Sequence, residues 1–166
     1  MFELKPLSKE GIPRALERAE RYRLLNEPRV AESICRDILR TQPENQQALI
    51  MLILAVTDQF ARGPSSFAKV ALDLIPQLKQ EYDRAYYTGI IYERQGKAKL
   101  NQGGPGSGFE AYDLLRTAMD WFEKAEAMHP AGNEDAILRW NTCARIIMNN
   151  RLTARGEESF EPELLE

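Results

Sequence analysis

The chain contains two segments of one pattern, AESICRDILRTQP at residues 31–43 and AMDWFEKAEAMHP at residues 118–130. In each segment, small or apolar residues stand at offsets 0, 4 and 7, and a proline stands at offset 12. Residues at such three- and four-residue steps lie on one face of an α-helix. Proline does not continue a helix, so it marks where each helix ends. Both segments are therefore predicted to be amphipathic helices that end in the same way.

The helices that precede these two segments also match each other. Four residues share the offsets 0, 3, 4 and 7, namely Ala15, Arg18, Ala19 and Tyr22 in one helix and Ala85, Thr88, Gly89 and Tyr92 in the other. The small residues Ala19 and Gly89 allow a second helix to cross closely, and a larger side chain fills the space beside each crossing. The repeating unit is therefore a pair of helices, which is typical of repeat proteins.

This spacing resembles the tetratricopeptide repeat (TPR), a helix–turn–helix unit of 34 residues. The resemblance implies an all-α fold, a right-handed α-solenoid of about seven helices arranged as antiparallel pairs. It assigns residues 1–166 to a single TPR-like domain. The implied repeats are at about 12–45, 46–80 and 82–130, followed by a final helix at 133–150 and an acidic tail at 151–166.

The third repeat is longer than the family pattern. Gly89 and Ala118 are 29 positions apart, whereas Ala19 and Ala31 are 12 positions apart. We therefore expect an elongated hairpin of two helices, with the glycine-rich segment 103–108 at its tip. Ser107 and Glu110 have the spacing of a capping box at the start of the second helix.

Other helix ends are predicted from breakers and caps. Pro13 places the first helix start near Gly11. A strongly apolar helix is predicted over 44–60, and another over 65–80 that kinks or frays near Pro76. Asn133 is a plausible cap for the last helix.

In TPR proteins the first helix of each pair lines a concave groove that binds a segment of another protein. By that resemblance, the groove here would be lined by Leu16, Glu20, Arg23, Ile50, Leu54, Asp58, Tyr86, Ile90, Arg94, Asn141 and Arg145. Apolar and aromatic side chains supply binding energy, and arginines pair with carboxylates. The expected function is a non-catalytic protein–protein interaction module, an adaptor or scaffold that binds a peptide or helix. The alternatives are a homo-oligomeric structural protein and a small chaperone. The variants Tyr86→Ala and Arg94→Glu are expected to weaken binding without disturbing the fold.

One TPR subclass holds a C-terminal carboxylate with lysine, asparagine and arginine side chains. The corresponding positions here hold other residues, namely Leu16, Glu20, Met51, Asp83 and Tyr87. That carboxylate clamp is therefore not expected.

Charge and composition narrow the class of partner. The net charge is −3, with +3 in residues 1–100 and −6 in residues 101–166, so no nucleic-acid partner is expected. The longest apolar run, residues 48–56, is too short to span a membrane. The N-terminus lacks an export pattern and the two cysteines fit core positions, so a cytoplasmic protein is expected.

No cofactor, metal site or catalytic group is expected. The glycines at 103 and 108 have phosphate-loop spacing, but Phe109 and Glu110 stand where lysine and serine or threonine are required. His129 is the only histidine, and no ligand cluster surrounds it in the sequence.

Two charged segments have simple expected roles. On the first helix, Glu10–Arg14 and Glu17–Arg21 have the spacing of helical ion pairs. The tail contains Phe160, Leu164 and Leu165 among five glutamates in residues 157–166. It is expected to be either a solvated end or a segment that lies in a groove of its own or a neighbouring chain.

Overall fold

The computed structural model describes residues 1–156, which are all-helical and contain no strand. Two short 3-10 helices are present, η1 (Lys9–Gly11) and η2 (Ile75–Gln77). The α-helices of this part of the chain are α1 (Ile12–Leu24), α2 (Pro28–Thr41), α3 (Gln46–Thr57), α4 (Phe67–Leu74), α5 (Glu81–Gln102), α6 (Ser107–Met128) and α7 (Asp135–Asn149).

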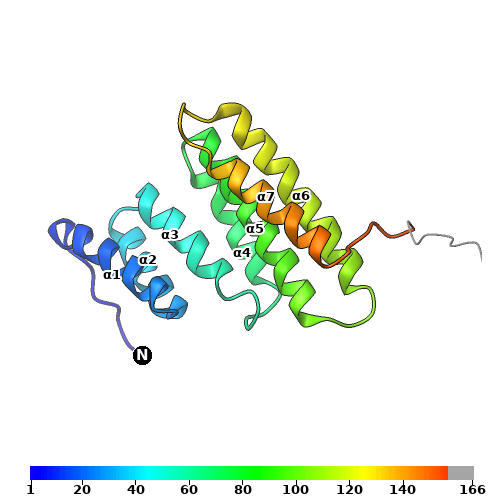
Figure 1. Ribbon diagram of the computed structural model, residues 1–166. Coiled ribbons are helices and arrows are strands. Elements are labelled where there is room, and N and C mark those ends of the chain that lie inside the picture. The colour runs from blue at the N-terminus through cyan, green and yellow to red at the C-terminus, as the bar shows by residue number, and fades with distance from the viewer. Residues whose placement is uncertain (157–166) are drawn as a thin grey trace, which may run out of the picture.

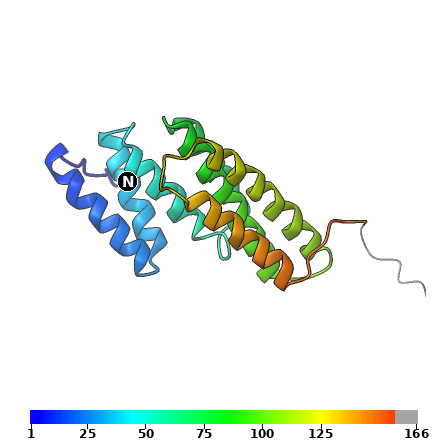
Figure 2. The same ribbon diagram turned by 45° about the horizontal axis from the view of Figure 1, so that its top comes forward.

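The helices follow one another along an elongated molecule, with α1 at one end and α6 and α7 toward the other (Figures 1 and 2). Each α-helix packs on the next one in the chain, and α1 also contacts α3, α3 contacts α5, and α5 contacts α7. The odd-numbered helices therefore form a row of their own. We call the surface along this row the odd-helix face.

The buried stripes expected from the sequence pattern are confirmed. Ala31, Cys35 and Ile38 of α2 are completely buried, as are their counterparts in α6, Ala118, Phe122 and Ala125. The pattern places small residues where helices pack closely and large residues beside them. It therefore selects the core-facing side of each helix.

The elongated hairpin is also present, because α5 and α6 each contain 22 residues, against 8 to 15 in the other α-helices. Two glycines of α5 allow this close packing. A Cβ atom at Gly89 would lie 2.5 Å from a ring atom of Phe122, and one at Gly96 would lie 2.9 Å from Cγ of Leu115. At the tip, Gly103, Gly104 and Gly106 all have positive φ angles, which let the chain reverse.

Several predicted helix ends are wrong. The helix predicted over 44–60 extends only over Gln46–Thr57, because Asn45 caps it by accepting a hydrogen bond from the Ala48 N–H. The helix predicted over 65–80 is the short α4, which gives way to η2 at Ile75, next to Pro76. This change from an α-helix to a tighter 3-10 helix at Pro76 agrees with the predicted kink or fraying there.

The predicted capping box is also wrong. Ser107 is the first residue of α6, the cap position is Gly106 in the left-handed conformation, and no side chain caps the helix. Glu110 instead forms an ion pair with Lys99, at 2.9 Å, across the hairpin. At the last helix, Asn133 accepts a hydrogen bond from the Asp135 N–H although it lies one residue before the cap.

The charged face of α1 also differs from the prediction. Within residues 1–156, neither Glu10–Arg14 nor Glu17–Arg21 forms an ion pair.

The two alternatives expected for the acidic segment 157–166 concern residues outside those the structure describes. Among the described helices, none combines the length and the apolar character needed to cross a membrane.

Candidate functional site

Three residues of the predicted groove meet on the odd-helix face. Arg23 of α1 donates hydrogen bonds from Nε and Nη2 to the carboxylate of Asp58, at 2.6 and 3.4 Å. Arg94 of α5 pairs through Nη1 with Oδ1 of the same carboxylate. Residues 35 and 36 positions apart in the sequence are thus held together. Asp58, just after α3, links two neighbouring helices of the row to its own.

Arg94 is more deeply embedded than the sequence suggested. Its Nη1 also donates to the hydroxyl of Thr57 at 2.7 Å and to the backbone carbonyl of Leu54 at 3.2 Å. Burial lowers the pKa of Arg94, and the carboxylate of Asp58 opposes that effect. Given these contacts, we now expect Arg94→Glu to disturb the fold, contrary to the expectation from the sequence. The variant would place a carboxylate against Asp58 and remove three hydrogen bonds.

A second carboxylate, not predicted as a site residue, extends this arrangement toward α7. Glu93 is completely buried, yet it pairs with Arg139 of α7 at 3.1 Å and with Lys97 at 3.5 Å. Cys143 also approaches it, with Sγ 3.7 Å from Oε1. Burial opposes the charge on Arg139, but Glu93, together with Tyr86 and Cys143, outweighs that effect and raises the pKa of Arg139. Only the Glu93–Lys97 spacing, four residues apart on one helix, could have indicated this cluster from the sequence.

We call these six charged residues the polar strip: Arg23, Asp58, Glu93, Arg94, Lys97 and Arg139. The strip contains four cations and two carboxylates. The side chains of Arg23, Lys97 and Arg139 remain 22%, 39% and 33% exposed. Arginine has five N–H groups, and Arg23 uses only two of them on Asp58. The strip therefore retains exposed donors suited to carboxylates.

The aromatic part of the predicted groove is mostly packed. Tyr86 is partly buried, stacks on Tyr82 with ring centroids 5.7 Å apart, and lies 5.9 Å from the ring of Phe122. Tyr87 meets Tyr86 edge to face, and burial raises the pKa of Tyr87 to about 12. The variant Tyr86→Ala would therefore also disturb packing, contrary to the expectation that it leaves the fold intact.

The other predicted groove residues fall into three groups. Ile90 is 1% exposed, so it belongs to the core and offers no surface to a ligand. Partly buried positions packed against the core are occupied by Leu16, Ile50 and Leu54. Glu20 and Arg145 are exposed, and Asn141 is half-buried.

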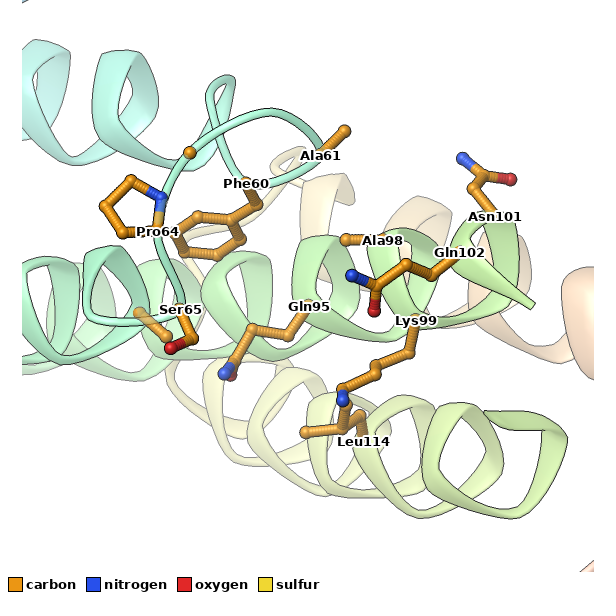
Figure 3. A pocket seen from close by; sticks show the side chains of 12 residues that line it. Phe60, Ala61, Pro64, Ser65, Gln95, Ala98, Lys99, Asn101, Gln102 and Leu114 are labelled. Atoms are coloured by element: carbon orange, nitrogen blue, oxygen red, sulfur yellow. The ribbon is translucent and has the colours of Figure 1, made fainter. Parts of the chain in front are cut away.

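A separate pocket of about 290 Å³ lies beside the hairpin, away from the polar strip. Figure 3 shows Phe60 and Pro64, from the segment between α3 and α4, facing Gln95 and Lys99 of α5 and Leu114 of α6. Its wall combines apolar side chains with amides and one cation. The Oε1 atom of Gln95 is buried without a hydrogen-bond partner.

Residues 1–156 contain no group of three or more histidine, cysteine, aspartate or glutamate side chains arranged to hold a metal ion. Cys35 and Cys143 are both buried as free thiols. Comparison of the chain with protein-family models, with curated proteins and with solved structures finds no match.

Proposed function

We propose that this protein is a TPR-like helical repeat that binds a segment of another protein on its odd-helix face. The polar strip is the observation that carries this proposal. It brings together charged residues from four segments distant in sequence and keeps three cations partly exposed. The order of helix contacts, with each helix on the next and odd-numbered helices in a row, supports the repeat architecture.

The same geometry defines what a partner must supply. Cations outnumber carboxylates in the polar strip by four to two, and arginine and carboxylate groups form strong paired hydrogen bonds. A partner segment with acidic side chains would bind the donors of Arg23 and Arg139 that the strip leaves free. Apolar side chains of the partner would rest on the part-exposed surfaces of Leu16, Ile50 and Leu54.

Site-specific photo-cross-linking in native lysate tests this proposal without altering the strip itself. A photoreactive amino acid would replace Glu20 or Arg145, which are exposed positions on α1 and α7, the first and last helices of the odd-numbered row. Matched control positions are Arg40 of α2 and Asp113 of α6, which are also exposed and charged. We expect adducts with the same partner from positions 20 and 145, and none from positions 40 and 113.

The cross-linked partner would then be titrated against the purified protein at increasing salt. Binding through the polar strip should weaken as salt screens the exposed cations. Adducts that form equally from all four positions, or only from the controls, would place the interaction elsewhere. Those outcomes would contradict the proposed binding face.

Self-association is the second candidate, because exposed apolar side chains cluster around the α1–α2 turn. Leu24 is 75% exposed, Leu25 61% and Val30 38%. Contiguous exposed apolar surface is typical of interaction sites. Sedimentation velocity over a range of concentrations distinguishes this candidate, since a constant monomer mass would exclude it.

A further inference from the structure

The pocket of Figure 3, which we call the hairpin pocket, is enclosed by three parts of the chain. Its floor is one stripe of α5, whose members stand three or four residues apart and so lie on one side of the helix: Gln95, Ala98, Lys99 and Gln102. Leu114 of α6 closes one side, and the segment between α3 and α4 closes the other. The pocket therefore lies where the long hairpin meets the preceding repeat.

The wall between α3 and α4 is held in place by its own backbone. The N–H groups of Arg62 and Gly63 both donate to the carbonyl of Gln59, at 3.1 and 2.7 Å. The N–H of Phe67 donates to the carbonyl of Pro64 at 3.0 Å. A Cβ atom at Gly63 would lie 2.7 Å from the ring of Phe67, so this turn is closely packed. The wall is thus ordered before any ligand arrives, which lowers the entropy lost on binding.

The size and the apolar surface of the pocket point to a small ligand with an apolar body. Phe60, Pro64 and Leu114 supply most of the apolar wall. The volume of about 290 Å³ lies at the lower end of the roughly 300–1,000 Å³ that is typical of ligand pockets. A compound about the size of an amino acid derivative therefore fits, whereas a nucleotide cofactor is too large.

Two polar groups on the floor define what else the ligand must carry. Lys99 is the only charged residue among the described residues that line the pocket, and its side chain is 45% exposed. Its ammonium group has three N–H donors, so pairing with Glu110 at 2.9 Å leaves donors for a second carboxylate. The Oε1 atom of Gln95 is buried without a partner. Gln95 is only half-buried as a residue, so its amide can turn toward the pocket, where a ligand N–H would supply that partner.

We propose that the hairpin pocket binds a small carboxylic acid with an apolar body and an N–H group, such as an N-acylated apolar amino acid. The apolar body lies against Phe60, Pro64 and Leu114. The N–H group donates to Oε1 of Gln95, and the carboxylate accepts from Nζ of Lys99. Gln95 and Lys99 are one helical turn apart, so they reach two neighbouring groups of one small molecule. The hairpin pocket is distinct from the polar strip, so this inference does not rest on the proposed function.

The test is an amide NMR titration of the full chain with N-acetyl-L-leucine, which carries all three features. We expect saturable shifts of the amide signals of Ala61, Ala98 and Lys99, with a dissociation constant in the millimolar range for a compound of this size. Two matched analogues each lack one feature. The O-acetyl ester of the corresponding hydroxy acid has an oxygen in place of the N–H and should bind about 2- to 10-fold more weakly. The N-methylamide of N-acetyl-L-leucine lacks the carboxylate and should bind about 2- to 5-fold more weakly, because Lys99 is partly exposed.

Variants on the floor of the pocket assign each preference to one side chain. Gln95→Leu should make the acid and its ester analogue bind equally, and it should not lower the melting temperature, because it removes a buried atom without a partner. Lys99→Met should make the acid and the N-methylamide bind equally. The matched control is Lys79→Met, since Lys79 is also exposed and pairs with Glu44 at 3.2 Å. That variant should retain the preference for the acid.

A second pair of variants locates the binding. Ala61→Trp fills the pocket from an exposed position on its rim, whereas Ala131→Trp adds the same side chain at an exposed position on the α6–α7 connection. Binding of N-acetyl-L-leucine should be lost with the first variant and retained with the second. Thermal melting of both variants, matched to the unaltered chain, shows that the fold is intact.

Three results would overturn the proposal. The first is the absence of saturable shifts at the pocket with N-acetyl-L-leucine at millimolar concentration. The second is equal binding of the acid, its ester analogue and its N-methylamide to the unaltered chain, because neither Gln95 nor Lys99 would then contact the ligand. The third is binding that persists in Ala61→Trp, which would place the ligand on another surface.

Discussion

The close packing of α5 and α6 at Gly89 predicts an unusual response to a glycine-to-alanine change. Alanine normally stabilises a helix interior relative to glycine by about 0.8–1 kcal/mol. At Gly89, however, the added Cβ would lie 2.5, 2.7 and 2.9 Å from three ring atoms of Phe122. Phe122 is completely buried, so its ring has no solvent-filled space into which to move. Overpacking of this kind costs about 1–3 kcal/mol, and we expect Gly89→Ala to cancel or reverse the usual gain.

The matched control is Gly108→Ala, also within a helix of the same hairpin. A Cβ there would meet only Leu152, at an ordinary distance of 3.7 Å. Gly108→Ala should therefore retain much of the helix-propensity gain, up to about 1 kcal/mol. Equilibrium urea unfolding followed by circular dichroism gives the free energy of unfolding for each variant. The two variants should differ by about 1–3 kcal/mol in favour of Gly108→Ala.

A double variant connects the effect to the ring. Phe122→Leu alone leaves a cavity and should be destabilising. Combined with Gly89→Ala, the smaller side chain leaves room for the new methyl group. The free energy of unfolding lost in the double variant should therefore be smaller than the sum of the losses in the two single variants. If Gly89→Ala stabilises the protein as much as Gly108→Ala does, the close crossing is not present in solution, and the register assigned to the hairpin fails with it.

Three further predictions follow from other contacts. Ala118→Leu, at a completely buried position, should lower the free energy of unfolding by about 1–3 kcal/mol, and unchanged melting would contradict the assigned helix register. Arg139→Met should destabilise the protein by about 2–3 kcal/mol in urea unfolding, because Glu93 loses its closer partner while buried. A smaller loss in the Glu93→Gln/Arg139→Met double variant would confirm that cause. The pKa of Glu110 is lowered by Lys99, so its contribution to stability is present above its unfolded pKa and is lost as the pH falls through the folded value. In an NMR titration, Lys99→Met should raise the pKa of Glu110 toward its ordinary value, and an unchanged pKa would exclude the pairing.

Sequence periodicity predicted the helical class, the buried stripes and the long hairpin because these features depend on which side of a helix is apolar. Ala31 and Ala118 are recognisable from spacing alone, since close packing tolerates only small residues there. Helix ends depend instead on backbone conformation at single residues. The left-handed Gly106 moved the start of α6 by making Ser107 helical, and no spacing rule distinguishes that outcome from a capping box.

The candidate site was predicted less completely than the fold. The family resemblance placed Arg23, Asp58 and Arg94 on one face, and the structure brings these three together. It did not reveal that Arg94 is embedded. Glu93 was missed because a fully buried carboxylate is rare, and its partner Arg139 lies 46 positions away. Pairing at that separation depends on the tertiary arrangement of α5 and α7, which single-helix patterns do not contain.

The polar strip connects the stability of the fold with the binding proposed for it. Asp58 holds Arg23 and Arg94, and Glu93 holds Arg139, so these arginines are held in place before any ligand arrives. A side chain that is already ordered loses less conformational entropy on binding. Because Arg23 keeps three of its five N–H groups free of Asp58, an acidic partner adds contacts without displacing the internal carboxylate. Binding should therefore increase the stability of the helix row, by an amount set by the ligand concentration relative to its dissociation constant. A partner whose stabilising effect did not weaken as salt screened the exposed cations would have to use a surface other than the strip.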